Sequence, residues 1–336
     1  MGEAGTALSD DALSAMAVNP AGLARLSYPE AGFSYNKLYE DLSLQSIAVA
    51  YPHRTLGTFG LSATLLQVKN LTGYDNAGTR MSDVKSMDLA VMPVYARRLW
   101  GPEEDRRYGL FGGVGLKVVR EELDLVRSNA VMGDAGVLFA NPLGPGVLSA
   151  GASGHNLGRG HKFDAIREKS PAVYRVGFGY SLNLFGDPLT FVYDARVPTY
   201  DDMTHGGGLE YSVRRFMSWR VGYVSHQDFG PGYRFGVGFR VKALSVDYAL
   251  SHFGRFGYTH LMALSTRLGE PIEITPVISP TEEKARRKIE RGKVFMKEGR
   301  SLEAAVEFDD ALKLDPLNKE ALEQLRQVKE GLERAK

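Results

Sequence analysis

Residues 233–241 read YRFGVGFRV, with aromatic or aliphatic side chains at the odd-numbered positions and arginine or glycine at the even-numbered positions. Residues 174–182, YRVGFGYSL, repeat this design, and residues 217–223, MSWRVGY, carry it a third time. Alternation with a period of two puts the apolar side chains on one face of a β-strand. We therefore expect β-strands that each have one apolar face.

About fourteen such runs occur between residues 31 and 268, separated by clusters of Gly, Pro, Asn and Asp that predict turns. The connections between the runs alternate in length. Short ones are expected near residues 53–55, 141–145, 184–187, 215–216 and 242–243, and longer polar ones near 68–85, 120–129, 157–170 and 198–205. Because short turns at one end and long loops at the other are typical of outer-membrane proteins, we expect an all-β transmembrane barrel of about fourteen antiparallel strands.

A soluble β-sandwich or propeller is the alternative fold, because its strands also alternate. The residues on the second face of each run help to distinguish it from a transmembrane barrel. In a soluble protein that face would be solvated and rich in Lys and Glu, whereas here it is mostly Gly, Ser, Ala and scattered Arg. Small residues with a few long polar ones suit a narrow, filled lumen. A soluble sandwich or propeller stays open as the other fold, although the sequence contains no visible repeat of blade length.

The composition excludes several classes of protein. The chain has 336 residues, with 41 Lys and Arg against 40 Asp and Glu, and it has no cysteine. It lacks a run of about 18 to 20 apolar residues, which excludes a helical membrane protein. The net charge of +1 gives no reason to expect nucleic-acid binding, and without cysteine there are no disulfides or thiolate metal sites. Residues 1–5, MGEAG, do not begin a signal peptide, and we interpret the chain as lacking its leader.

A run of small residues with turn formers at both ends precedes the first strand. Residues 5–24 read GTALSDDALSAMAVNPAGLA. This stretch resembles the N-terminal signature of the FadL and PorV families, in which small residues, an acidic pair and then Asn-Pro-Ala-Gly-Leu lead into the barrel. The resemblance implies a fourteen-stranded barrel whose N-terminus folds inside as a hatch that moves to let hydrophobic ligand pass.

Carried over to this sequence, the resemblance implies that Asn19, Pro20, Ala21 and Gly22 form the turn of the hatch. Pro20 fixes its own φ and biases Asn19 toward extended backbone, while Gly22 permits close backbone approach. A plain turn before a strand is the alternative reading of these four residues.

Several basic side chains fall on the small-residue face and would point into the lumen. They are Lys117, Arg175, Arg214, Arg220, Arg234, Arg240 and Arg267, of which the arginines from 175 to 240 are the candidate ligand residues. They would attract an anionic headgroup such as a carboxylate. The other reading is a structural network of ion pairs, since buried charges need partners. The acidic partners would be Asp134, Asp194, Glu210 and Asp247.

The sequence changes character after the last predicted strand. Residues 270–280 form a linker that contains proline, and residues 281–336 are charged with helical spacing of apolar residues. Small, aromatic and proline residues match the spacing of one tetratricopeptide repeat at Gly292, Phe295, Ala304, Phe308, Ala311 and Pro316. The resemblance implies packed antiparallel helices. Because about three repeats are normally needed for stability, we expect this one to dock on the barrel or to bind a periplasmic or exported protein.

The sequence gives little indication of catalysis. Its seven histidines lack metal-ligand spacing, its glycine clusters lack the context of a phosphate loop, and it contains no Gly-x-Ser-x-Gly motif. We expect neither enzyme activity nor a metal or cofactor, although acyl hydrolysis by a Ser and His pair stays open as the catalytic alternative.

The sequence therefore predicts four segments: a hatch or plug (1–30), an outer-membrane barrel (31–269), a linker (270–280) and a tetratricopeptide-like module (281–336). We expect the barrel to contact outer-membrane lipid, with both termini in the periplasm. The expected function is passive transport of hydrophobic or amphipathic small molecules such as long-chain fatty acids. The alternative is a PorV-like secretion or assembly factor, or a scaffold, that binds exported protein and periplasmic partners.

Overall fold

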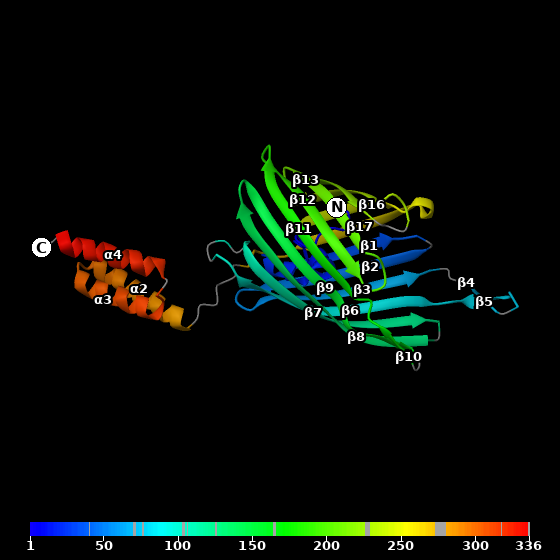
Figure 1. The fold of residues 1–336 in the computed structure, drawn as a ribbon, viewed down its shortest axis with the longest axis horizontal. Coiled ribbons are helices and arrows are strands. Elements are labelled where there is room, and N and C mark those ends of the chain that lie inside the picture. Colours follow the sequence, from blue (N-terminus) through cyan, green and yellow to red (C-terminus); the bar gives the residue numbers. More distant parts are fainter. Residues whose placement is uncertain are drawn as a thin grey trace. The chain divides into compact units, whose positions relative to one another are not determined.

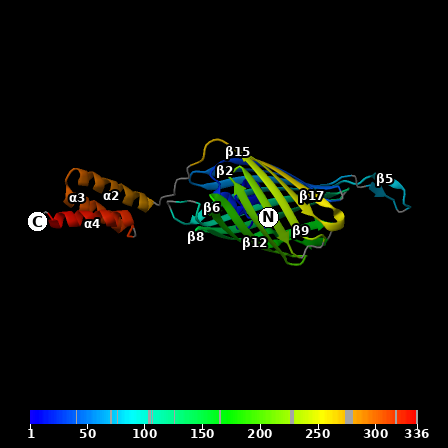
Figure 2. The same cartoon turned by 90° about the horizontal axis from the view of Figure 1, so that it is seen from above.

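The computed structural model describes residues 1–336 apart from residues 40, 70–71, 76, 103–104, 106, 125, 164–165, 226–228, 273–279, 317 and 335–336. The chain forms two compact units, Met1–Ile274 and Thr275–Lys336. The first is a β-barrel that encloses the N-terminus, and the second consists of three helices (Figure 1, Figure 2).

In the described part of the chain, fourteen antiparallel strands form a closed barrel, as the sequence predicts. The barrel strands are β1 (Glu30–Lys37), β2 (Leu42–His53), β3 (Gly57–Val68), β6 (Ser86–Trp100), β7 (Gly109–Leu123), β8 (Val126–Leu143), β9 (Gly146–Phe163), β11 (Val173–Leu184), β12 (Asp187–Pro198), β13 (Thr204–Val213), β14 (Met217–Val224), β15 (Tyr233–Val241), β16 (Leu244–His252) and β17 (Tyr258–Arg267). Strands adjacent in this order pair with one another, and β17 pairs with β1 to close the ring.

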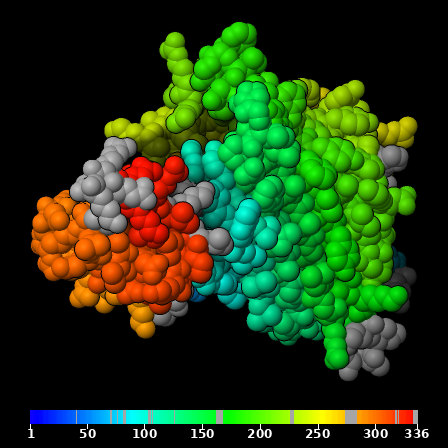
Figure 3. Space-filling model, turned by 60° about the vertical axis from the view of Figure 1, so that its left-hand side comes forward, coloured from blue at the N-terminus to red at the C-terminus, as the bar shows by residue number. Residues whose placement is uncertain are grey.

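The alternation seen in the sequence is confirmed by the burial of side chains. In β15, Phe235 is 57% exposed on the outer face, whereas Arg234 on the inner face is 7% exposed. Exposed apolar side chains also lie on the outer face of β2 (Ile47, Val49) and of β14 (Trp219). The outer wall seen in Figure 3, coloured cyan to green, is built from strands in the middle of the sequence. An exposed apolar surface that runs around the barrel is unstable in water but stable in lipid, so the barrel is a transmembrane one.

The barrel has a turn end and a loop end. Most connections at the turn end are short, such as residues 54–56 and 242–243, whereas the connection between β6 and β7 spans residues 101–108. The chain also enters β1 and leaves β17 at this end. The loop end holds the longer connections, including residues 69–85, where β4 (Thr72–Tyr74) and β5 (Arg80–Asp83) form a hairpin. Figure 1 draws this hairpin well beyond the barrel strands.

Two long loops predicted from the sequence are wrong. Residues 120–123 and 126–129 are paired extensions of β7 and β8, and β9 continues through Phe163 to pair with β10 (Ile166–Lys169). These extensions lie beyond the outward apolar residues of the barrel. There both faces of the sheet can meet water, so the apolar period disappears while the backbone ladder continues.

The second unit has a small core of its own. Its helices are α2 (Pro280–Lys297), α3 (Ser301–Leu314) and α4 (Lys319–Arg334). Phe308, Ala304 and Ala311 of α3 are fully buried, and a Cβ atom added at Gly292 of α2 would lie 2.5 Å from the Phe308 ring. The Arg300 guanidinium lies 4.3 Å from the centre of the Phe295 ring. Pro316 is exposed in the connection after α3.

Residues 273–279 of the predicted linker lie outside the described residues. Among the helices described, none combines the length and the apolar character required to span a bilayer.

Candidate functional site

The N-terminal segment occupies the lumen of the barrel. It contains a short helix, α1 (Ala12–Val18), and a 3-10 helix, η1 (Pro20–Arg25). α1 contacts β1, β2 and β3, and η1 contacts β2, β3, β6, β7 and β8. Ala15, Ala21 and Leu23 are fully buried in these contacts. We call residues 1–29 the plug; the N-terminus lies among the barrel strands in both views (Figure 1, Figure 2).

Inward-facing glycines of the barrel wall make room for the plug backbone. A Cβ atom added at Gly113 of β7 would lie 2.4 Å from the carbonyl carbon of Pro20. One added at Gly151 of β9 would lie 2.2 Å from the carbonyl oxygen of Thr6. Non-bonded carbon and oxygen atoms do not approach this closely. The glycines of the alternating runs therefore seat the plug, which the sequence alone did not indicate.

Asn19 joins the two plug helices to the barrel wall. Its side-chain Nδ2 donates to the carbonyl oxygens of Thr6 at 2.8 Å and Val137 at 3.0 Å, and its Oδ1 accepts the N–H of Ala21 at 3.1 Å. The residue is fully buried, with the extended backbone that precedes a proline. Its side chain satisfies three backbone groups at the junction of α1 and η1. Asn19 is thus the N-cap of η1, whose first residues are Pro20, Ala21 and Gly22, and its side chain binds the wall.

Carboxylates of the wall accept hydrogen bonds from plug backbone. Asp194 of β12 accepts the N–H groups of Gly5 and Thr6 at 3.0 Å each, and also the Thr6 hydroxyl at 2.6 Å. Arg175 of β11 lies 3.8 Å from the same carboxylate oxygen. An ionised acceptor makes these bonds stronger than neutral ones, and the nearby guanidinium compensates the buried charge.

A second wall carboxylate works in the same way at the start of α1. Glu30 of β1 accepts the N–H of Ala12 at 3.3 Å, and its other oxygen accepts from Nε of Arg267 at 3.1 Å. The free N–H groups of a helix N-terminus favour a negative charge. The inward charge pairs therefore hold the plug in place.

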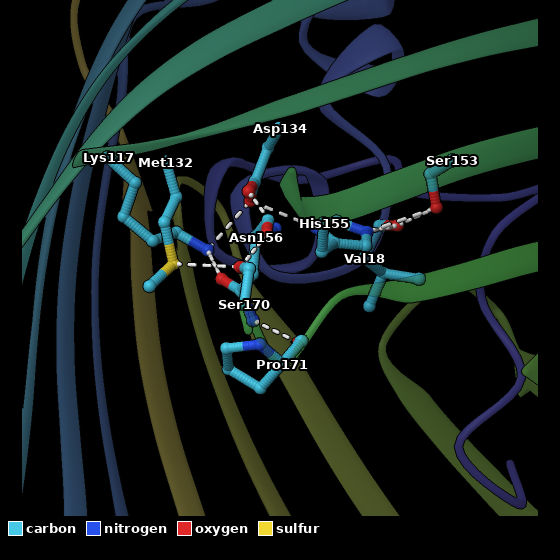
Figure 4. A network of polar contacts seen from close by, with 9 residues as sticks. All are labelled: Val18, Lys117, Met132, Asp134, Ser153, His155, Asn156, Ser170 and Pro171. Carbon is cyan, nitrogen blue, oxygen red and sulfur yellow. Dashed lines mark hydrogen bonds and ion pairs between the residues drawn. The ribbon is translucent and has the colours of Figure 1, made fainter. Parts of the chain in front are cut away.

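His155 of β9 links the wall to the end of α1 (Figure 4). Its Nε2 atom lies 2.7 Å from the carbonyl oxygen of Val18, and its Nδ1 atom lies 3.0 Å from Oδ2 of Asp134. The Ser153 hydroxyl donates to the same Val18 carbonyl at 2.7 Å. A carbonyl oxygen only accepts, so Nε2 of His155 carries a hydrogen in this contact.

The same contacts resemble those of a hydrolase triad, in which a serine, a histidine and an aspartate are linked in series: Ser153, His155 and Asp134. The Ser153 hydroxyl lies 3.0 Å from Nε2 of His155. In a triad, Nε2 must accept the serine proton. Here both groups donate to the plug instead, and both side chains are buried. The arrangement in this structure is an anchor for the plug, without a free nucleophile.

Asp134 of β8 connects this anchor to the open lumen. Its Oδ2 atom lies 2.8 Å from Nζ of Lys117, and its Oδ1 accepts the N–H of Asn156 at 2.8 Å. Asn156 has a positive φ of 54° where the register of β8 and β9 shifts. Its side-chain oxygen accepts from Lys117 at 2.8 Å. The bulge thus turns Asn156 toward the lumen, beside Lys117.

A cavity of about 910 Å³ lies between α1 and the wall of the lumen. Most of its lining is apolar and includes Leu13, Met16, Ala48, Ala90, Met92 and Met132. Polar groups gather at Lys117, Asn156, Glu121 and His161. The volume lies within the usual range for a small-molecule site, and an apolar cavity with a few polar groups suits an amphipathic molecule.

The five candidate arginines do not line this cavity. Arg175 is paired with Asp194 beside the plug, as described above. Arg220 forms ion pairs with both Glu210 and Asp247, and Arg234 lies 3.4 Å from the Glu3 carboxylate. Arg220 and Arg234 border a second cavity of about 540 Å³. The alternative reading of a paired charge network describes these three residues better than a ligand site does.

The inward position predicted for Arg214 is wrong, whereas Arg240 lies on the inner face of β15 but at its open turn end. Arg214 follows β13 in the tight turn to β14, with a φ of 48°, and is exposed. Arg215 shares the positive φ, as expected for the two central residues of the turn in which the Phe216 N–H donates to the Val213 carbonyl. Arg240 is exposed near the turn at 242–243, where its Nε donates to Ser245 at 3.0 Å. Both arginines lie at the turn end of the barrel, away from the cavity.

Sequence reasoning missed the role of His155 and Asn156. The signal for Lys117 was its place on the inward face of an alternating strand, and that position is confirmed. No comparable signal marks the bulge, because it depends on pairing between β8 and β9. Among the described residues, no group of three or more His, Asp or Glu is arranged to hold a metal ion.

No protein-family model matches the sequence, and no curated protein matches it. Similar solved structures include the toluene transporter TodX of P. putida, at 10% identity and a TM-score of 0.47, covering 76% of this chain and 94% of that one. An outer membrane protein of Acinetobacter baumannii is 10% identical with a TM-score of 0.42, covering 73% and 100%. The KdgM porin is 11% identical with a TM-score of 0.34, covering 71% and 99%. These likenesses concern the barrel architecture and leave the substrate open.

Proposed function

We propose that this chain is a passive outer-membrane transporter of the FadL type for amphipathic small molecules such as long-chain fatty acids. The observation that carries the proposal is the cavity of about 910 Å³ between the plug and the wall. Met16 and Met92 offer apolar contact for an alkyl chain. Lys117, which lines the cavity and lies 2.8 Å from Asp134, offers a cation that a ligand carboxylate would share with that residue. In this proposal the loop end faces outward, both termini lie in the periplasm, and the plug acts as a hatch.

A binding experiment tests the cavity. Ala90 lines the cavity, whereas Ala63 on the neighbouring strand, β3, is on the outer face. Ala90→Trp should fill the cavity and weaken binding of a fluorescent fatty acid to the purified protein at least tenfold. Ala63→Trp adds the same side chain toward lipid and should leave binding unchanged. Equal binding by both variants and the parent would contradict the proposal.

A disulfide tests whether the plug must move. A Cβ atom added at Gly32 of β1 would lie 2.7 Å from Cγ of Leu13 in α1. This is close to the roughly 3 Å between a Cβ atom and the distal sulfur of a disulfide. Because the chain has no cysteine, the variant L13C/G32C can form one intramolecular bond only. In cells that express it, oxidation should lower uptake of radiolabelled oleate at least tenfold, and reduction should restore it. Unchanged uptake after complete oxidation would exclude this movement.

The helical unit favours a second candidate function, that of a PorV-like secretion or assembly factor, or a scaffold. It has its own core, and α3 exposes Leu302 and Val306, which lie four residues apart on one face. If the unit is a tetratricopeptide-like module, this face would bind a periplasmic or exported protein. Deletion of residues 281–336 should then remove co-purified protein while fatty-acid binding stays intact. Unchanged co-purification would exclude this function.

A further inference from the structure

Strand register sorts the outward residues of β1, β2, β3, β6, β7 and β8 into rows. One row is entirely apolar and runs through Phe33, Ile47, Ala63, Val91, Val118 and Val131. The next row toward the loop end is mixed: Tyr35, Gln45, Leu65, Leu89, Arg120 and Asn129. The third row is mostly polar: Lys37, Ser43, Gln67, Met87, Glu122 and Arg127. Over these three rows, the outer surface of the barrel therefore changes from apolar side chains that suit lipid to polar side chains that suit water.

Basic residues gather at this boundary. Val68 at the end of β3 pairs with Ser86 at the start of β6, so Lys69 and Lys85 lie just beyond the ends of these neighbouring strands, and both are exposed. Together with Arg120 and Arg127 they form what we call the cationic cluster. Two lysines beside each other at the ends of paired strands repel each other unless an anion lies near them.

Glu122 is the carboxylate that holds the cluster together. It lies 3.1 Å from Lys85, 3.2 Å from Arg127 and 3.8 Å from Arg120. The side chains of these cations are 48% to 58% exposed, whereas that of Glu122 is only 5% exposed. The carboxylate is thus covered by its partners, and the surface presented outward is cationic. Asp124 is a second acid nearby, since its N–H donates to the Lys85 carbonyl.

The opposite half of the barrel has a different boundary. Toward the loop end, the Tyr193 hydroxyl lies 2.7 Å from Nδ1 of His205, and the Tyr248 hydroxyl lies 2.8 Å from Nδ1 of His260. Aromatic side chains with a polar tip suit any membrane interface. The cationic cluster is therefore a local feature of β3, β6, β7 and β8 that a general interfacial role does not explain.

We propose that the cationic cluster binds the phosphate groups of an anionic lipid in the leaflet at the loop end. The cluster lies where the apolar rows end, which is the level of lipid headgroups. Guanidinium groups bind phosphate oxygens in a bidentate manner, and lysine adds a compact charge. A lipid that carries phosphate monoesters, such as bisphosphorylated lipid A, fits the cluster best because several cations can share its charge.

Lipid binding by the protein in phosphatidylcholine nanodiscs tests this proposal. Each basic residue near an anionic surface contributes roughly a fivefold gain in affinity. The variant K85Q/R127Q should therefore bind bisphosphorylated lipid A about 25-fold more weakly than the parent. The matched variant K242Q/R215Q removes the same charges from exposed positions at the turn end and should bind like the parent. All four side chains are exposed, and a heat-modifiability assay checks that both variants fold.

Two further arms identify the source of the phosphate. Dephosphorylated lipid A should bind to the parent as weakly as bisphosphorylated lipid A binds to K85Q/R127Q. Inorganic phosphate at the same concentration should not displace the lipid, since the acyl chains hold it beside the apolar rows. Equal affinity of the two variants, equal binding of the two lipids, or displacement by inorganic phosphate would each overturn the proposal.

Discussion

The Nε2 atom of His155, on barrel strand β9, lies 2.7 Å from the carbonyl oxygen of Val18, the last residue of plug helix α1. One net hydrogen bond of this kind stabilises by about 1 kcal/mol. His155→Ala should therefore loosen the plug and raise amide hydrogen exchange of residues 12–19 by roughly fivefold. Exchange detected by mass spectrometry measures this directly, because the barrel strands act as an internal reference.

His205 supplies the control for that experiment. It lies at the start of β13 and bonds to Tyr193 on the outer face of the barrel. His205→Ala removes the same side chain and should leave exchange in residues 12–19 unchanged. If both variants loosened the plug equally, the His155 contact would not be the cause.

Asp194 and Thr6 should be coupled in a double-mutant cycle. Asp194→Asn removes the charge that accepts three hydrogen bonds from the plug, and Thr6→Val removes the hydroxyl donor. Each single variant should destabilise the binding of the plug to the barrel wall by about 1 to 3 kcal/mol. The double variant should lose less than the sum by at least about 0.5 kcal/mol, because the two changes remove a shared bond. Additive losses in hydrogen exchange of residues 5–19 would show that the contact is not energetically coupled.

Gly113 should not tolerate a side chain, because its added Cβ would lie 2.4 Å from the Pro20 carbonyl carbon. Gly113→Val should displace η1 at a cost of about 1 to 3 kcal/mol. We expect higher single-channel conductance in planar bilayers, since the plug no longer fills the lumen. Gly133→Val is the comparison, because its Cβ would meet nothing closer than 3.7 Å. Raised conductance in both variants would point to a general effect on the wall.

The barrel could be predicted from the sequence because its outer surface obeys one rule. In β15, every second residue faces lipid, so the alternation is strict and the strand is found. This alternation is lost where a strand extends beyond the lipid-facing surface. The end of β7, at Glu121 and Glu122, is therefore predicted as a loop although its backbone is fully paired with β8. Strand number was thus accessible from local pattern, while strand length was not.

The site was less accessible, because it depends on which inward residues meet. Arg175 and Lys117 were placed inward correctly, but their partners come from other strands. The contact of His155 with Val18 joins residues 137 positions apart through a bulge that no local pattern marks. Inward glycines such as Gly151 were read as room for long side chains, whereas they admit plug backbone. Sequence patterns report the environment of a residue, and not its partner.

The seating of the plug should depend on pH through Asp11, the N-cap of α1. Burial, with a smaller effect of the neighbouring Asp10, raises the pKa of Asp11 above its usual value of 3.8. An acid with a raised pKa in the seated state disfavours that state when ionised, so seating gains stability as the pH falls through the raised pKa. Exchange of residues 12–18, corrected for intrinsic rates, should become slower as the pH is lowered from neutral toward the usual pKa of 3.8. Asp11→Asn keeps an N-cap and should abolish this difference; a pH effect that persists in the variant would assign it to another group.

The helical unit should unfold independently when its central aromatic residue is removed. Phe308 is fully buried against Gly292, so Phe308→Ala leaves a cavity and should cost about 3 to 5 kcal/mol. That loss is comparable to the whole stability of so small a unit, so helical circular dichroism should fall while the barrel keeps its heat-modifiable shift. Val306 on the same helix is 60% exposed, and Val306→Ala should leave the helical signal unchanged. Loss of the barrel signal in Phe308→Ala would mean that the two units fold as one, which their separate cores argue against.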